Sequence, residues 1–253
     1  IRVSSTSRGL GDVYKRQNYY NSTNNSNGIY VSSNSSSWTI TGNRLYQTAE
    51  RVYTVSTEHY GIFISSGSGY TISGNIIGFA DDNGNGKTLM IGNSVSLPGF
   101  PSAYNLSGTP VSIRYLGIAC SFDLFGTTST INGNQVSGIA MFTSNGNATL
   151  NGMFCGIYIE SGTAVLGNLA SNTIGSTTGT NSIYVATTTS GGTVVGIRAA
   201  CSGNALVQNN KIGGIVASGT AANICAGFTG ISVAGNAVFT VSNNEIGNSD
   251  AAN

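Results

Sequence analysis

The sequence has few charged residues and few prolines. Only 8% of its 253 residues are charged, and three are proline. Stretches rich in Leu, Ala, Glu and Lys with a 3.6-residue period are absent, which argues against helices. No apolar run approaches the ~20 residues that a membrane-spanning helix needs. The hydrophobic fraction of 40% is nevertheless too high for a solvated linker, so the chain should fold.

Residues that could bind a metal are also sparse. The four cysteines, Cys120, Cys155, Cys201 and Cys225, form no CxxC pair and have no histidine nearby, which favours buried free thiols over a zinc site. Residues 81–86 read DDNGNG, like the opening of a calcium loop, but Gly92 stands where the closing glutamate should be. We expect a Gly/Asn turn at Asp81–Gly86, with calcium binding as the alternative. No cofactor and no metal ligand is therefore predicted.

Four of the ten basic residues lie in the first seventeen positions. Residues 7–17, SRGLGDVYKRQ, resemble over their whole length the translation of a transposase adapter used for sequencing libraries. We therefore exclude residues 1–17 from the fold as an adapter-derived segment. Residues 18–253 are expected to be the folded part of the chain. They hold six basic and eight acidic residues, which gives no support for a nucleic-acid partner.

A repeat runs through the remaining chain. A Gly-Ile pair opens each copy, and an asparagine follows fourteen to seventeen residues later. The positions three before and two after that asparagine are aliphatic in every copy. The pairs are Gly28-Ile29, Gly61-Ile62, Gly117-Ile118, Gly156-Ile157, Gly196-Ile197 and Gly230-Ile231, and the asparagines are Asn43, Asn75, Asn134, Asn172, Asn210 and Asn244. The aliphatic residues are Ile40, Ile72, Ile131, Leu169, Val207 and Val241 before, and Leu45, Ile77, Val136, Ile174, Ile212 and Ile246 after.

Such a repeat is typical of stacked coils. One coil cannot bury its own apolar face, whereas coils stacked about 4.8 Å apart bury a continuous column of aliphatic side chains. Stacked asparagines can hydrogen-bond to one another and can adopt the left-handed conformation of a corner, so we expect an internal ladder at one turn. The interval of 59 residues between Asn75 and Asn134 is unusually long. Residues 81–110 there are expected to form an excursion, and a degenerate coil at Met90-x-x-Asn93-x-Val95 is the alternative.

The pattern predicts an all-β, right-handed parallel β-helix of about six coils with variable loops. Residues 18–253 are expected to be a fragment of such a β-helix, truncated at both ends. Across residues 28–247 the chain resembles the right-handed parallel β-helix proteins of the pectin-lyase-like class, in particular the Ser/Thr/Asn/Gly-rich proteins that bacteria secrete to their surface. The resemblance implies an extracellular or cell-surface location. It does not imply one activity, because the class includes polysaccharide lyases and hydrolases, tailspikes and non-catalytic adhesive proteins.

The residues that could support catalysis do not align. Enzymes on this scaffold need carboxylates that converge across adjacent coils, but Glu58, Asp123 and Glu160 occupy different positions relative to their glycines. The sole histidine, His59, is expected at the surface, on the face of the strand opposite Glu58. Arg114 and Arg198 could bind an acidic sugar, and Arg198 is expected to point outward, but neither is expected to have an acid in register.

An outward aromatic strip is the remaining candidate. Tyr30, Phe63 and Tyr158 occupy the same position of three coils, where they could hold sugar rings, while Ala119, Arg198 and Ser232 interrupt them. Stacking that only stiffens the sheet is the alternative. We therefore predict a non-catalytic, adhesin-like secreted scaffold without catalytic residues, and surface glycans are its candidate partners. A polysaccharide lyase or glycoside hydrolase with its site partly outside this chain and a carbohydrate-binding module are the alternatives.

Overall fold

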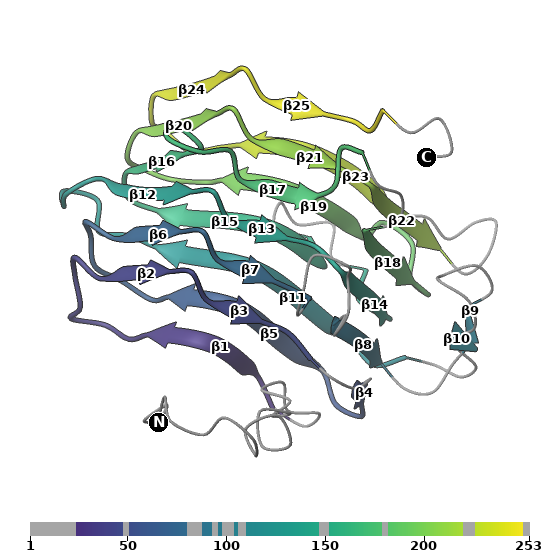
Figure 1. Ribbon diagram of the computed structural model, residues 1–253. Helices are drawn as coiled ribbons and strands as arrows, with labels where there is room; N and C mark the ends of the chain where they lie inside the picture. Colours follow the sequence, from purple (N-terminus) through teal and green to yellow (C-terminus); the bar gives the residue numbers. More distant parts are fainter. Residues whose placement is uncertain are drawn as a thin grey trace, which may run out of the picture.

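The chain winds into a right-handed parallel β-helix, as the repeat predicts. The computed structural model describes residues 24–47, 51–79, 88–92, 96–97, 104–105, 110–146, 152–178, 182–219 and 226–249. Within these residues every helix or strand assigned is a β-strand. Six coils stack from the purple to the yellow end of Figure 1, and each adds one strand to three parallel sheets, A, B and C. Five coils add a strand to a fourth parallel sheet, D.

Each sheet takes one strand from successive coils. Sheet A contains β1 (Ser26–Val31), β5 (Thr57–Ile64), β11 (Ile113–Ser121), β15 (Phe154–Ser161), β19 (Thr193–Ala199) and β23 (Gly227–Val233). Sheet B contains β2 (Thr39–Thr41), β6 (Thr71–Ser73), β12 (Ser129–Asn132), β16 (Ala164–Leu166), β20 (Ala205–Gln208) and β24 (Phe239–Ser242). Sheet C contains β3 (Arg44–Leu45), β7 (Ile76–Ile77), β13 (Gln135–Val136), β17 (Thr173–Gly175), β21 (Lys211–Gly213) and β25 (Glu245–Ile246). Sheet D contains β4 (Arg51–Tyr53), β8 (Thr88–Gly92), β14 (Ile139–Thr143), β18 (Ile183–Thr187) and β22 (Ile215–Gly219).

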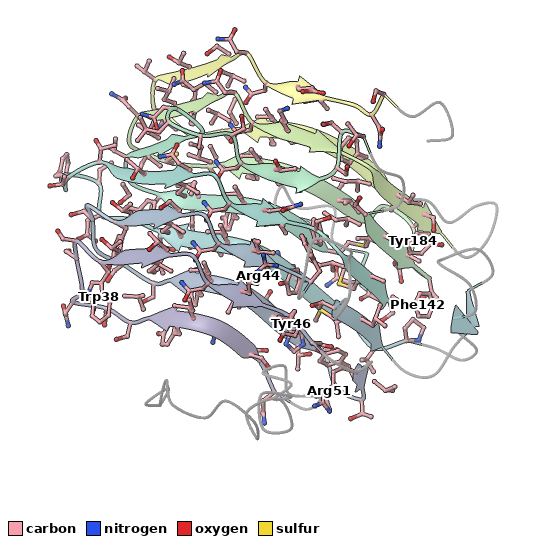
Figure 2. All side chains as sticks on the ribbon, in the orientation of Figure 1. Trp38, Arg44, Tyr46, Arg51, Phe142 and Tyr184 are labelled. Carbon is pink, nitrogen blue, oxygen red and sulfur yellow. The ribbon has the colours of Figure 1, made fainter. Side chains whose placement is uncertain are left out.

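The isoleucines of the Gly-Ile pairs form one continuous inner column on sheet A. Successive members face each other in register from Ile29 to Ile231. The four central ones are fully buried. The preceding glycine is needed because sheet C packs closely at that point: a Cβ on Gly61 would lie 2.8 Å from Ile77 and 2.5 Å from the carbonyl oxygen of Gly117. Side chains fill the space between the sheets, while Trp38 lies at the edge where β1 leads into β2 (Figure 2).

The predicted asparagine ladder is continuous through all six coils. Each side-chain Nδ2 donates to the Oδ1 of the asparagine in the next coil, at 2.9–3.0 Å. From Asn75 onward each Nδ2 also donates to a carbonyl of the preceding coil, as Asn134 does to Ile72 at 2.9 Å. The backbone N–H of Asn134 also donates to Asn172 Oδ1. The ladder thereby satisfies the polar groups of the corner between sheets B and C.

The prediction is wrong for one member of the aliphatic columns, Leu169. Leu169 is 83% exposed, and Leu166 takes its place in sheet B, in register with Ile131 and Val207. Coil four has a longer connection between Leu166 and Asn172 than the other coils, so counting back three positions from Asn172 reaches the loop instead of the strand. The other aliphatic positions stack as predicted.

Sheet D has no counterpart in the sequence-based prediction. Met90 belongs to β8 in this sheet, in register with Arg51 and Met141, and so does not start an extra coil. Strands β5 and β11 pair directly, as do β7 and β13, so coils two and three are neighbours, but Thr88–Gly92, predicted as part of the excursion, belongs to sheet D. A short antiparallel pair, β9 (Ser96–Leu97) and β10 (Tyr104–Asn105), follows β8 in the chain. Residues 1–23, Asp81–Gly86, Asn93, Val95 and Cys225 lie outside the described residues.

Candidate functional site on the outer face of sheet A

An outward column of unlike residues crosses sheet A from coil to coil. Its members are Tyr30, Phe63, Ala119, Tyr158, Arg198 and Ser232, which face one another in the register that the repeat predicts. Tyr30 stacks on Phe63 with ring centroids 5.5 Å apart and an interplanar angle of 21°. Ala119 then interrupts the aromatic series, and Tyr158 resumes it one coil later. The column is therefore an aromatic stack with one ring missing.

A cavity lies where that ring is missing. Coils repeat about every 4.8 Å, so the backbones that carry Phe63 and Tyr158 are about 9.6 Å apart, with Ala119 on the strand between them. The cavity has a volume of about 210 Å³. It is lined by Glu58, Tyr60, Phe63, Arg114, Leu116, Ala119, Cys120, Ser121, Tyr158 and Glu160. We call it the Ala119 slot.

The floor of the Ala119 slot is apolar, although it lies on the outside of the sheet. Leu116, Ala119, Cys155 and Val195 are at most 2% exposed and form a cluster separate from the core, with Tyr60, Phe63 and Tyr158 packed around it. Tyr60 stacks on Phe63 with ring centroids 4.7 Å apart. An apolar floor with aromatic walls and a few polar groups at the rim is typical of a ligand-binding site.

Glu58 and Arg114 form one polar wall of the slot. They face each other in register on β5 and β11 and form an ion pair. Tyr60 donates its hydroxyl to Glu58 Oε2 at 2.7 Å, and Arg114 Nε donates to the carbonyl of Gly152 at 2.9 Å. The prediction that Arg114 has no acid in register is therefore wrong. The signal was present in the sequence, because both residues stand three positions before the glycine of their Gly-Ile pairs.

Glu160 forms the opposite rim. It is exposed on β15 and accepts a hydrogen bond from the Ser121 hydroxyl at 2.5 Å. The pKa of Tyr60 is raised, first by burial, then by its hydrogen bond to Glu58 and by the charges of Glu58 and Glu160. Burial and the charge of Glu160 also raise the pKa of Tyr158. Both phenols therefore stay protonated. Glu58 and Glu160 both contribute to the raised pKa of Tyr60.

His59 is not at the surface. Its side chain is fully buried on the inner face of β5, where Nε2 lies 2.7 Å from Thr57 Oγ1 and the ring packs 4.5 Å from that of Tyr53. Burial lowers the pKa of His59 to about 4. Glu58 lies on the opposite face, as predicted from the alternation of the strand, so the two residues do not form a proton-transfer pair.

Arg198 occupies the outward position predicted for it but is only 4% exposed. Its Nη1 donates to Ser232 at 2.5 Å in the next coil. The residues in register with it are Tyr158 and Ser232, neither of which is an acid. Arg198 therefore continues the stack beyond Tyr158 and does not line the Ala119 slot.

The structure gives structural roles to the other candidate residues, the cysteines and Asp123. Cys120, Cys155 and Cys201 are free and buried. Asp123 accepts a hydrogen bond from the backbone of Gly67 at 3.0 Å. The part of the chain that the structure describes contains no group of three or more His, Cys, Asp or Glu residues arranged to hold a metal ion. Nor does it include a helix long and apolar enough to cross a membrane.

Comparisons with known proteins add no relative. No protein-family model matches the chain, and neither a curated protein nor a solved structure matches it. The function must therefore be argued from the geometry of the Ala119 slot and of the coils that hold it.

Proposed function

We propose that the chain is part of a non-catalytic, adhesin-like β-helix scaffold at the cell surface that binds carbohydrate on the outer face of sheet A. The Ala119 slot carries this proposal. Aromatic walls suit the apolar faces of a sugar ring, and the rim offers carboxylate oxygens and hydroxyl groups for sugar hydroxyls. The long stack of low-charge coils suits a rigid display scaffold, since each coil is supported by its neighbours.

The polar groups of the slot favour binding over catalysis. A glycosidase needs one carboxyl group that holds a proton and a second that acts as a base or nucleophile. Arg114 and Tyr60 both engage Glu58 directly, one at each carboxylate oxygen, so both oxygens are already in contact with protein groups. Glu160 is exposed to water on the opposite rim. The raised pKa values of Tyr60 and Tyr158 argue against a phenolate base of the kind that a lyase could use.

Binding can be tested with the purified full chain on an array of neutral oligosaccharides, followed by calorimetry on those retained. Phe63→Ala and Tyr158→Ala should each weaken binding about tenfold, because a ring that stacks on a ligand contributes about 1–3 kcal/mol. Phe125→Ala is the matched control, since Phe125 is 97% exposed and lies outside the slot. Circular dichroism would confirm that all variants remain folded.

Two outcomes would contradict the proposal. A folded chain that retains no glycan would remove the binding function. Release of new reducing ends or unsaturated products, lost in Glu160→Gln, would instead make the enzyme the leading interpretation.

A further inference from the structure

We propose that the Ala119 slot selects an amino sugar, a single pyranose ring with a protonated amine, over the neutral and the anionic sugar of the same shape. This inference rests on the carbohydrate-binding function proposed above. It specifies the charge of the ligand and the residue that recognises this charge, Glu160.

The size of the slot limits the ligand to one ring. The strands that carry Phe63 and Tyr158 are two coil repeats apart, about 9.6 Å between backbones, and the cavity beside Ala119 has a volume of about 210 Å³. One ring in contact with both walls needs two contact distances of about 3.5–4.0 Å, whereas two rings would need three. The cavity therefore suits a single pyranose ring, and Ala119 is the residue whose small side chain leaves this gap in the aromatic stack.

The charge at the rim is unbalanced. Arg114 pairs with Glu58 and donates to the carbonyl of Gly152, so its charge is already offset, and its remaining Nη2, which has no hydrogen-bond partner within the described part of the chain, is buried. Glu160 receives only the neutral hydroxyl of Ser121 among the hydrogen bonds and ion pairs of the described residues. The nearest further cation of the column, Arg198, lies beyond Tyr158 and donates to Ser232. The open side of the slot therefore presents one carboxylate without a cationic partner.

The aromatic walls, like Glu160, favour a positively charged ligand. The face of an aromatic ring carries partial negative charge and attracts an ammonium group within about 6 Å. An amine on the bound ring would meet Glu160 and the face of Tyr158, whereas a ring carboxylate would meet a like charge. The slot is therefore complementary to a cationic ring and unfavourable for a uronate.

Three methyl glycosides of one ring shape test the selection: the β-glucosaminide with its free amine, the β-glucoside and the β-glucuronide. Calorimetry or chemical-shift titration of the full chain at pH 6 should give the tightest binding for the glucosaminide, about fivefold to tenfold tighter than the glucoside. This factor corresponds to a partly exposed ion pair together with a cation–π contact. The glucuronide should bind most weakly, and the N-acetylated glucosaminide should bind like the glucoside.

Glu160→Gln identifies the residue responsible. The variant should bind glucosaminide and glucoside with equal affinity, since Gln keeps the shape and an acceptor oxygen but not the charge. Glu245→Gln is the matched control: Glu245 is an exposed carboxylate on sheet C, 3.6 Å from Lys211, and its loss should leave the preference intact.

The outcomes separate the two proposals. If no glycoside binds the folded chain, the carbohydrate-binding function fails. If the glycosides bind but the amine gives no advantage, or if Glu160→Gln keeps that advantage, amino-sugar selection fails and the binding function stands.

Discussion

The two faces of sheet A follow different rules on the same backbone. One column of the inner face repeats the same residue in every coil, the isoleucines from Ile29 to Ile231. On the outer face, the column from Tyr30 to Ser232 changes from coil to coil. An inner position is constrained by the coils above and below and by the sheets opposite, whereas an outer position is constrained only by its neighbours. The repeated positions therefore maintain the fold, and the unrepeated ones are free to form a site.

The largest effect is expected from a charge placed in the inner column. Ile157 is fully buried and has an isoleucine in register on both sides. Ile157→Asp would bury an unpaired carboxylate and should destabilise the fold by more than about 4 kcal/mol, abolishing cooperative unfolding. Urea or thermal unfolding would measure this, with the exposed Phe125→Ser as control. An unchanged melting curve would show that Ile157 is not in the column.

A smaller loss is expected from a break in the asparagine ladder. Asn134 accepts from the backbone and the side chain of Asn75 and donates to Asn172 and Ile72. Asn134→Ala leaves several of these groups buried without a partner, and should cost about 3 kcal/mol. Asn43→Ala, in the half-buried first coil, should cost about 1 kcal/mol, because water can reach the groups that it exposes. Equal costs at the two positions, measured by urea unfolding, would contradict a cooperative ladder.

The inner face was largely predictable from the sequence, and its exceptions have physical causes. The ladder and the two columns flanking it were visible because Asn43, Asn75 and their equivalents stand at fixed distances from both strands. Leu169 was misplaced because coil four lengthens the connection before its asparagine, which moves Leu166 into the column. Sheet D escaped prediction because loops of unequal length separate its strands from the asparagines, so no fixed spacing marks them.

The outer face was predicted less well. The register of Tyr30, Phe63 and Tyr158 agrees with the prediction, in which Ala119 only interrupts the strip, whereas in the structure the gap that Ala119 leaves is the slot. The pairing of Glu58 with Arg114 has a clear spacing signal, but this signal matches an acid with a base and does not appear among the carboxylates alone. The burial of His59 could not be read from its local sequence, since it depends on sheet D packing across from β5.

Lowering the pH should destabilise the fold through the inner face of sheet A, where His59 lies. His59 is buried and its pKa is lowered to about 4, compared with 6.5 in an exposed histidine. The unfolded chain therefore binds a proton more readily than the folded chain, and stability falls as the pH drops from about 6.5 towards 4. Between pH 7 and pH 5 this loss should reach about 2 kcal/mol. It is measured by urea unfolding at each pH.

Because His59 is the sole histidine, one variant provides the control. His59→Leu should remove most of the stability change between pH 7 and pH 5, whatever its effect at pH 7. Retention of the full pH dependence in this variant would assign it to the carboxylates of the outer face instead.

The smallest effect on stability, and the most informative for the site, is expected from filling the gap on the outer face. Ala119→Phe places a ring between Phe63 and Tyr158, where the slot of about 210 Å³ can accept it. Aromatic pairs contribute about 0.5–1.5 kcal/mol beyond their buried area, so the variant should unfold at slightly higher urea concentration. It should also lose glycan binding, because its own side chain replaces the ligand. A variant that folds, gains stability and still binds would show that the ligand site lies elsewhere. A destabilised variant would instead mean that the outer column is packed as tightly as the inner one, and that the difference between the two faces is one of sequence alone.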